Sequence, residues 1–143
     1  MSFNINETDR LLSTTRSVKR RLDLQREVSE EIILDCIDIA EQAPTGGNQS
    51  SRRWLVIRDP KTKKEIADLY REVGGKFLKE QSELLDGTGH HNEKTIKASS
   101  YLAEHLEEVP VIVLVTIYGQ HDGSGRPGLF DSVIQAAWSF CLA

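Results

Sequence analysis

The sequence predicts a single domain, residues 1–143, that combines amphipathic helices with two apolar strands. Apolar residues recur at helical spacing along residues 29–40. The run VIVLVTIY, residues 111–118, is continuously apolar and rich in β-branched residues, a pattern typical of a strand covered on both faces. Between them, APTGGNQSSRRWLVI (residues 43–57) ends a helix, turns through small residues and begins a strand.

Composition narrows the class of protein. Hydrophobic residues make up 38% and charged residues 28%, the proportions of a globular domain with a core. A net charge of -4 argues against a general nucleic-acid binder. The longest apolar stretch, residues 109–117, is too short to cross a membrane, and no signal peptide is recognised. The two cysteines, Cys36 and Cys141, occupy apolar helical positions, which predicts core thiols and a cytoplasmic protein.

A basic cluster lies near the N-terminus, where Arg16, Lys19, Arg20 and Arg21 surround Ser17. One interpretation is a solvated basic turn. The other is a phosphate clamp, because arginine offers a bidentate fork, lysine a point charge and serine a hydroxyl donor. The cluster alone does not decide between them.

The first long helix begins after Ser29, which caps it, and buries one face. A strand follows at residues 54–57. A second helix is expected from about residue 61 to a stop at Gly74-Gly75. The residues expected on the buried faces of the two helices are Ile33, Cys36, Ile37 and Ala40, then Ile66, Leu69, Tyr70 and Val73.

The second half continues with a helical pattern over residues 77–85, an exposed loop over residues 86–93 and a helix over residues 96–106. The strand at residues 111–118 is the expected centre of the sheet. A flexible connection, residues 119–128, leads to a last helix with so few polar residues that it must be buried in the core or against a second subunit. The face expected to be buried carries Phe130, Val133, Ile134, Ala137, Trp138 and Cys141.

Three motifs in this order resemble the flavin-dependent nitroreductase family: TRSVK at residues 15–19, APTGGN at 43–48 and EVPVIVLV at 108–115. The resemblance extends over residues 9–143. It implies an α+β, three-layer α-β-α fold with a central sheet flanked by helices. It also implies an intertwined homodimer that binds FMN at its interface and passes hydride from NAD(P)H to nitroaromatics, quinones or related small-molecule acceptors.

The resemblance assigns site residues one by one. Arg16 and Ser17 match the family's N-terminal Arg-Arg-Ser-x-Arg motif, whose residues hold the FMN phosphate and ribityl chain. Thr15 replaces its first arginine, and Lys19 its last, which keeps the charge but loses the bidentate fork.

Pro44, Thr45 and Asn48 match the loop that reaches the isoalloxazine ring. The Gln-Pro-Trp that follows in the family is replaced by Ser50, Ser51 and Arg52. Since the flavin performs the chemistry, no catalytic side chain and no metal are expected.

Family members normally continue past the last helix into further flavin-binding and dimer-forming segments. The C-terminal part of the fold is therefore expected to be missing from these 143 residues, which predicts weak or absent retention of FMN. The alternative is a truncated, catalytically inactive module that dimerises or binds a ligand.

Three further patterns are interpreted as structural. The GxGxxG at Gly123, Gly125 and Gly128 lacks the βαβ context of a nicotinamide-binding Rossmann domain, so a flexible loop is favoured. His90 and His91 are expected to point apart in a loop, without a metal. Trp138 and Phe130 stand at helical spacing among aliphatic residues and are expected in the core.

Overall fold

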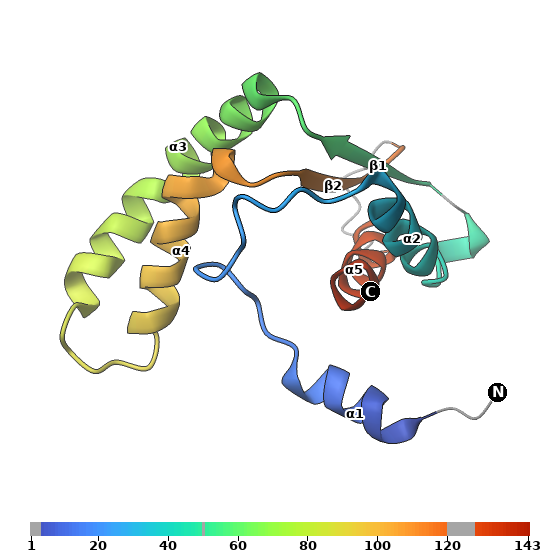
Figure 1. Cartoon of the computed structure of the whole chain (residues 1–143), viewed down its shortest axis with the longest axis horizontal. Helices are drawn as coiled ribbons and strands as arrows, with labels where there is room; N and C mark the ends of the chain where they lie inside the picture. The colour runs from blue at the N-terminus through green and yellow to red at the C-terminus, as the bar shows by residue number, and fades with distance from the viewer. Residues whose placement is uncertain (1–3, 50, 120–127) are drawn as a thin grey trace. The chain divides into compact units, whose positions relative to one another are not determined.

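The computed structural model describes residues 4–49, 51–119 and 128–143. They form two compact units, which are described separately below. Unit 1 comprises Met1–Arg16, Val28–Val56 and Val113–Ala143, and unit 2 comprises Ser17–Glu27 and Ile57–Ile112. The single domain expected from the sequence stays a prediction. Figure 1 labels the elements: α1 (Ile5–Thr14), α2 (Glu30–Ala40), η1 (Gly46–Asn48), β1 (Arg52–Ile57), α3 (Pro60–Leu85), α4 (Glu93–His105), η2 (Leu106–Glu108), β2 (Ile112–Ile117) and α5 (Gly128–Leu142).

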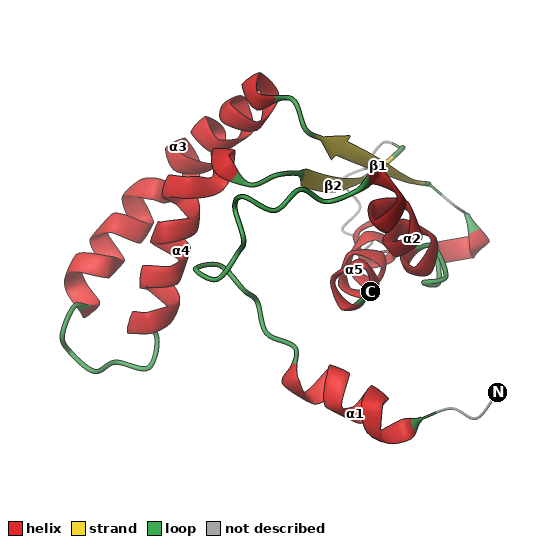
Figure 2. Ribbon diagram, in the orientation of Figure 1, coloured by secondary structure: helices red, strands yellow, loops and turns green. Residues whose placement is uncertain are grey.

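Helix α1 was not expected from the sequence. It begins after Asn4, whose side chain accepts a hydrogen bond from the backbone N–H of Glu7 at 3.4 Å. The asparagine followed three residues later by glutamate was the missed signal. None of its residues is buried, and the chain from residue 15 to residue 29 is loop (Figure 2).

Helix α2 confirms the first predicted helix. The Ser29 hydroxyl accepts from the backbone N–H of Ile32 at 3.3 Å, and Ile33 and Ala40 are buried. Helices α2 and α5 lie side by side in unit 1 (Figure 1). The apolar spacing read from the sequence therefore identifies both the helix and part of its buried face.

The two strands form an antiparallel pair. The Tyr118 backbone N–H donates to the Ser51 carbonyl at 2.7 Å, and the Thr116 hydroxyl donates to the Arg53 carbonyl at 3.1 Å, so residue numbers fall on one strand as they rise on the other. No residue of β2 is buried among the described residues. The expected cover on both faces is therefore not met, because Leu114, Thr116 and Tyr118, which alternate along one face of the strand, are exposed.

Helix α5 confirms the last predicted helix, but the face expected to be buried is mostly exposed. Phe130, Ile134 and Trp138 are 55%, 63% and 52% exposed, and Cys141 is also exposed. From residue 130 to residue 142 of this helix, where burial is described, the buried residues are Ser132 and Ala136, two small residues that allow close approach to the neighbouring elements of unit 1. The core positions expected for Phe130, Trp138 and Cys141 are thus wrong for this chain by itself. Cys36 is half-buried.

In unit 2, α3 and α4 form a helical hairpin (Figure 1). Asp59 caps α3 by accepting from the backbone N–H of Thr62 at 2.7 Å, and Pro60 occupies the first turn. The helix continues through Gly74-Gly75 to Leu85, so the predicted stop is wrong. Glycine lowers helix stability by only about 1 kcal/mol, which the packing of the hairpin offsets.

The buried face of α3 also differs from the expected one. Lys63 and Ala67 are buried, whereas Leu69, Tyr70 and Val73 are exposed. The Lys63 ammonium donates to the Val109 carbonyl at 2.6 Å, and this bond explains how a lysine is accommodated inside unit 2. Long cationic side chains, rather than the aliphatic stripe, therefore join α3 to the segment before β2.

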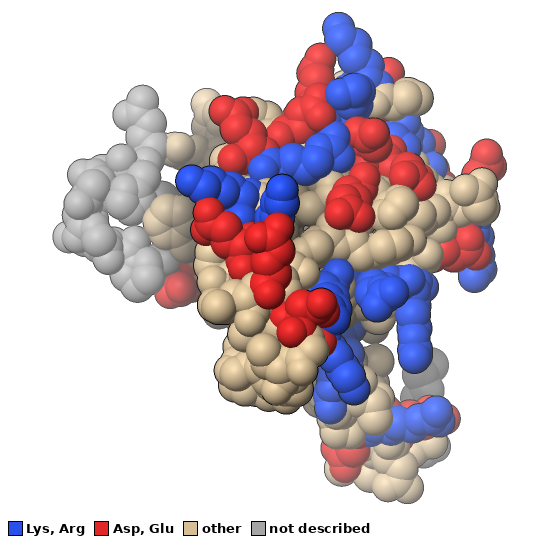
Figure 3. Space-filling view, turned by 90° about the vertical axis from the view of Figure 1, so that its left-hand side faces the viewer, with Lys and Arg blue, Asp and Glu red and all other residues tan. Residues whose placement is uncertain are grey.

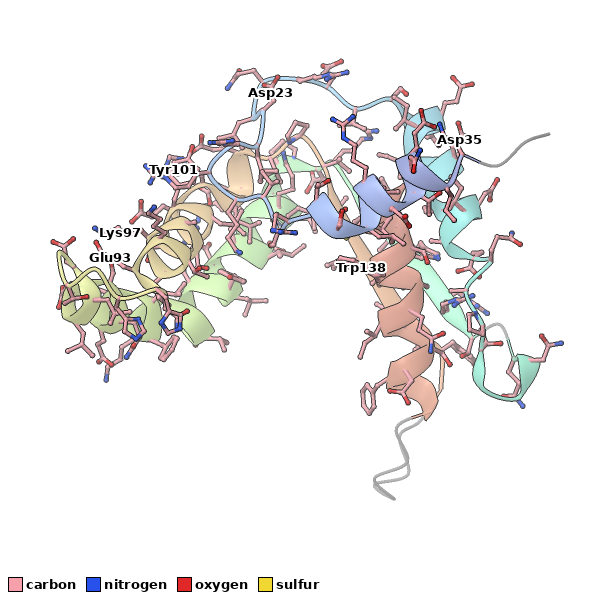
Figure 4. The ribbon with its side chains drawn as sticks, turned by 90° about the horizontal axis from the view of Figure 1, so that it is seen from below. Asp23, Asp35, Glu93, Lys97, Tyr101 and Trp138 are labelled. Carbon is pink, nitrogen blue, oxygen red and sulfur yellow. The ribbon has the colours of Figure 1, made fainter. Side chains whose placement is uncertain are left out.

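The turn of the hairpin, residues 86–92, confirms the predicted exposed loop. The rings of His90 and His91 stack with centroids 4.3 Å apart, so the expectation that they point apart is wrong. Lys97 pairs with Glu93 at 2.8 Å, and both side chains are labelled in Figure 4. Lys97 also pairs with Asp86 at 2.5 Å. On the face drawn in Figure 3, Lys and Arg side chains lie among Asp and Glu side chains.

The mixture of helices with a small sheet confirms the α+β class. The predicted flexible connection falls mainly on residues 120–127, which lie outside the described residues, as do Gly123 and Gly125 of the GxGxxG pattern. Among the residues that the structure describes, no helix combines the length and apolar character that crossing a bilayer requires.

Candidate functional site

The loop between α2 and β1, residues 43–49 and called here the glycine loop, has an unusual backbone. Gly47 has φ 64° and Asn48 has φ 56°, so two successive residues adopt the left-handed conformation. Glycine adopts it freely, and asparagine is among the few other residues that tolerate it. Two local bonds tighten the turn: Asn48 N–H to the Thr45 carbonyl at 3.1 Å and Gln49 N–H to the Gly46 carbonyl at 3.4 Å.

The predicted ring-side residues stand together on this loop. Pro44 and Asn48 are exposed, and Thr45 is half-buried. Neither the Thr45 hydroxyl nor the Asn48 side-chain amide hydrogen-bonds to a residue within the described ranges. A Cβ placed on Gly47 would meet only the side chain of Gln49, at 4.0 Å. The loop thus presents two polar side chains beside a stretch of backbone that a flat molecule can approach.

The glycine loop is tied to the rest of unit 1 by Arg52, the first residue of β1. The Arg52 side chain is 1% exposed, and its guanidinium donates to the carbonyls of Ser132 at 3.1 Å, Glu41 at 3.1 Å and Ala43 at 3.0 Å. The Ser132 hydroxyl accepts from the Gly46 backbone N–H at 3.0 Å. One arginine and one serine therefore connect the end of α2, the glycine loop and α5.

Glu41 neutralises this buried cation. Arg52 Nη2 donates to Glu41 Oε2 at 3.3 Å. Arg52 Nε lies 3.2 Å from Glu41 Oε1, close enough for an ion pair although without hydrogen-bond geometry. The Trp54 indole N–H donates to the same Oε1 at 2.6 Å, and its ring lies 5.3 Å from that of Phe140. Because each charge has an opposite charge and hydrogen-bond partners, the network is compatible with burial.

Sequence reasoning missed this network. Arg52 was noted only as the residue in place of the family's tryptophan, and Glu41 and Ser132 were not singled out. The available signal was Ser132, one of the few polar residues in a helix that is otherwise apolar. Its partners lie 80 and 86 residues away along the chain, a distance that helical or strand periodicity does not span.

The basic segment, residues 16–21, is organised only by local contacts. Arg16 is exposed, and its guanidinium donates to the carbonyls of Ser13 at 3.0 Å and Thr15 at 2.7 Å. Lys19 Nζ donates to the Ser17 hydroxyl at 3.2 Å, and the Arg20 guanidinium lies 5.9 Å from the centroid of the Tyr101 ring. The structure brings Ser17 and Lys19 together in unit 2. Arg16 belongs to unit 1, as does the glycine loop.

An apolar hollow of about 380 Å³ lies beside β2 and α5 in unit 1. It is lined by Val115, Thr116, Ile117, Gly119, Phe130, Val133 and Ile134. Part of its wall is thus the exposed apolar face of α5. No group of three or more potential metal ligands exists within the described ranges.

The nitroreductase family model matches residues 12–143, nearly the whole chain. The chain belongs to the nitroreductase family. The match includes both the basic segment and the glycine loop, so the resemblance drawn from the three motifs is confirmed. A comparison with curated proteins finds no match.

Two solved structures have a similar fold. The chain is similar to an oxidized iodotyrosine deiodinase bound to FMN and 3-iodo-L-tyrosine, with a TM-score of 0.64 and 20% identity over 92% of this chain. It is also similar to a BluB-like flavoprotein from Clostridium difficile 630, with a TM-score of 0.61 and 21% identity over 99% of this chain. It spans 65% of the deiodinase chain and 69% of the flavoprotein chain. At these identities the likeness concerns the fold.

Proposed function

We propose that this nitroreductase-family chain is a flavin-dependent oxidoreductase. It binds FMN, takes hydride from NAD(P)H and passes it to a small acceptor such as a nitroaromatic compound or a quinone. The observation that carries the proposal is the glycine loop, a turn tied to Arg52 and Ser132 that presents the Thr45 and Asn48 side chains without hydrogen-bond partners among the described residues. The similar deiodinase structure is bound to FMN, which supports the choice of flavin.

The residues of the glycine loop fit the ring of FMN. An isoalloxazine ring is flat and carries both hydrogen-bond donors and acceptors on its pyrimidine edge. The Asn48 amide offers both, and the Thr45 hydroxyl likewise donates and accepts. Gly46 and Gly47 lack side chains that would hold a ring away from the backbone.

The basic segment fits the phosphate. Arg16 and Lys19 supply positive charge, and the Ser17 hydroxyl supplies a donor. The bonds that these side chains make are to exposed backbone carbonyls and to each other, and a phosphate can exchange with them at little cost. The segment is proposed to close on the phosphate rather than to form a finished pocket in advance.

Bound FMN supplies the hydride chemistry, so the chain itself needs no nucleophile and no general base. Its own residues bind and orient. The glycine loop holds the ring, the basic segment holds the phosphate, and one face of the ring stays open for donor and acceptor in turn. Ping-pong kinetics are the expected form of turnover.

A homodimer is part of the proposal. Phe130, Ile134 and Trp138 recur every four residues along one face of α5, and each is more than half exposed (Trp138 is labelled in Figure 4). An apolar helical stripe of this kind marks an interaction surface. The sequence left open whether this face meets the core or a second subunit, and its exposure supports the second subunit. The free thiols of Cys36 and Cys141 are compatible with the proposed cytoplasmic location.

The second candidate function is a module that dimerises or binds a ligand without turnover. The same α5 stripe favours it, because dimerisation needs that face but no flavin. The two candidates differ in one property, the binding and reduction of FMN.

The test is a titration of the purified chain with FMN, followed by anaerobic addition of NADPH. Saturable binding and bleaching of the visible absorption band of the oxidised flavin support the oxidoreductase. Asn48→Ala is expected to weaken FMN binding. The control is Asn92→Ala, which changes an exposed asparagine in the turn between α3 and α4 and is expected to leave FMN binding unchanged. A dimer without FMN binding would favour the module.

A further inference from the structure

We propose that Arg52 and Ser132 are positioning residues of the FMN site, which hold the glycine loop in the conformation that presents Thr45 and Asn48. The inference rests on the proposed function. Neither residue is among those that the family motifs assign to the flavin, and neither is proposed to touch it. The argument comes from the contacts within unit 1.

The loop is fixed at two points. Arg52 donates to the carbonyl of Ala43, where the loop begins, and Ser132 accepts from the N–H of Gly46, in its middle. Pro44 and Thr45 lie between these points, and the two left-handed residues follow directly. Because each end of this short segment is tied, the direction of the Thr45 side chain is set by the ties.

Ser132 serves both ties. Its carbonyl accepts from Arg52 and its hydroxyl accepts from Gly46, so one residue of α5 places the guanidinium and the loop relative to each other. Ser132 is 5% exposed and Arg52 is 4% exposed, and water therefore competes little with these bonds.

The guanidinium is required for this geometry. Its five N–H groups form a rigid fork that reaches three carbonyls and a carboxylate at once. Lysine has one donor group at the end of a flexible stem, and the tryptophan of the family pattern has a single N–H. This chain therefore holds its loop in a manner that depends on the arginine.

The local bonds of the loop do not replace these ties. They join residues within four positions of each other, and the longer of the two is 3.4 Å. A site that is prepared before binding loses less conformational entropy when the ligand arrives. Loss of the ties should therefore weaken FMN binding even though no contact to FMN is removed.

The experiment compares Ser132→Ala and Arg52→Lys with two matched controls. Ser139→Ala changes a half-buried serine in the same helix. Arg71→Lys changes an arginine of unit 2 that also bonds a backbone carbonyl, of Ala103, and a carboxylate, of Glu107. Three properties are measured: the Kd for FMN, the hydrogen-exchange rate of the Gly46 amide without flavin, and the thermal midpoint.

Ser132→Ala is expected to accelerate Gly46 exchange and to raise the Kd for FMN by about tenfold, the upper range for one hydrogen bond. Riboflavin should lose the same factor, because the phosphate is not involved. Arg52→Lys should act in the same direction. Neither control variant should change the Gly46 exchange rate or the Kd for FMN, and the thermal midpoints of the controls and of Ser132→Ala should be similar.

Faster Gly46 exchange with an unchanged Kd would overturn the positioning role while leaving FMN binding intact. An unchanged exchange rate of the Gly46 amide in Ser132→Ala would show that the Ser132 hydroxyl does not hold the Gly46 N–H. Absence of FMN binding by the unaltered chain would overturn the proposed function, and the positioning role with it. If Arg52→Lys does not fold, Ser132→Ala, which removes a single hydroxyl, decides the outcome.

Discussion

The glycine loop and the basic segment are both assigned to the proposed FMN site, but they are held in different ways. The glycine loop is tied to Arg52 through the Ala43 carbonyl and to Ser132 through the Gly46 N–H, and Ser132 lies 80 residues from Arg52 and 86 from Gly46 along the chain. The basic segment makes bonds to residues at most three positions away, apart from the ring contact between Arg20 and Tyr101. The residues proposed to bind the ring are therefore held in place before binding, whereas the residues proposed to bind the phosphate are held only by local contacts.

The largest expected effect is on the network that prepares the loop. Arg52→Met removes the buried cation and leaves Glu41 and three carbonyls without their partner, and is expected to lower the free energy of unfolding by about 3 kcal/mol. The Arg71 side chain is 31% exposed, so Arg71→Met should lower the free energy of unfolding by only about 1 kcal/mol. Urea denaturation measures both. Equal losses of unfolding free energy in the two variants would show that the burial of Arg52 does not increase its contribution to stability.

The next effect concerns the basic segment. The double variant Arg16→Gln and Lys19→Gln should weaken FMN binding by about tenfold at low salt, since two charges that face a phosphate are lost. Riboflavin, which has no phosphate, should bind with unchanged affinity. Fluorescence titration with both flavins measures the difference, and Arg26→Gln is the control at an exposed position. An equal loss for both flavins would remove the phosphate role from this segment.

A smaller effect separates the conformation of the glycine loop from its stability. Gly47 and Gly87 have φ 64° and 69°, and a Cβ at either position meets no close neighbour. Alanine at either site should cost about 1 kcal/mol of stability because the left-handed conformation disfavours a side chain. Only Gly47→Ala should also weaken FMN binding. Thermal melts and FMN titrations test this pair of variants. An equal loss of FMN affinity in Gly87→Ala would contradict the proposal that the glycine loop binds FMN.

The smallest effect lies outside both regions, at the hairpin of unit 2. The hydrogen bond from Lys97, followed by those from the backbone of Gly87 and Gly89, lowers the pKa of Glu93 below its usual 4.5. A carboxyl whose pKa is lower when folded stabilises the fold above its unfolded pKa, and this contribution is lost as the pH falls through the folded pKa. Below about pH 4.5 the thermal midpoint should therefore fall more steeply for the unaltered chain than for Lys97→Gln. Parallel pH profiles would contradict this.

Local patterns predicted much of the fold. Ser29 and the apolar spacing after it located α2, and the apolar run before Tyr118 located β2. What failed was the burial of particular faces. Val73 and Trp138 are exposed although they stand at core spacing, while Lys63 and Arg52 are buried although they are charged. Burial depends on which neighbour a face meets, and periodicity carries no information about the neighbour.

The candidate site shows the same division. The family motifs assigned Thr45 and Asn48 to the proposed site because these residues belong to one continuous stretch of sequence. They did not identify Ser132, because its partners Gly46 and Arg52 come close only when the chain has folded. Contacts of this kind are the part of the site for which a structure is needed.

The central claim is that the chain binds FMN with the glycine loop, and amide chemical shifts during an FMN titration test it most directly. At 16.1 kDa the chain is suited to this measurement. The amide signals of Gly46, Gly47 and Asn48 should move in proportion to the bound fraction, while those of Gly87 and Gly89 stay fixed. Saturable FMN binding without movement of the first three signals would contradict the claim.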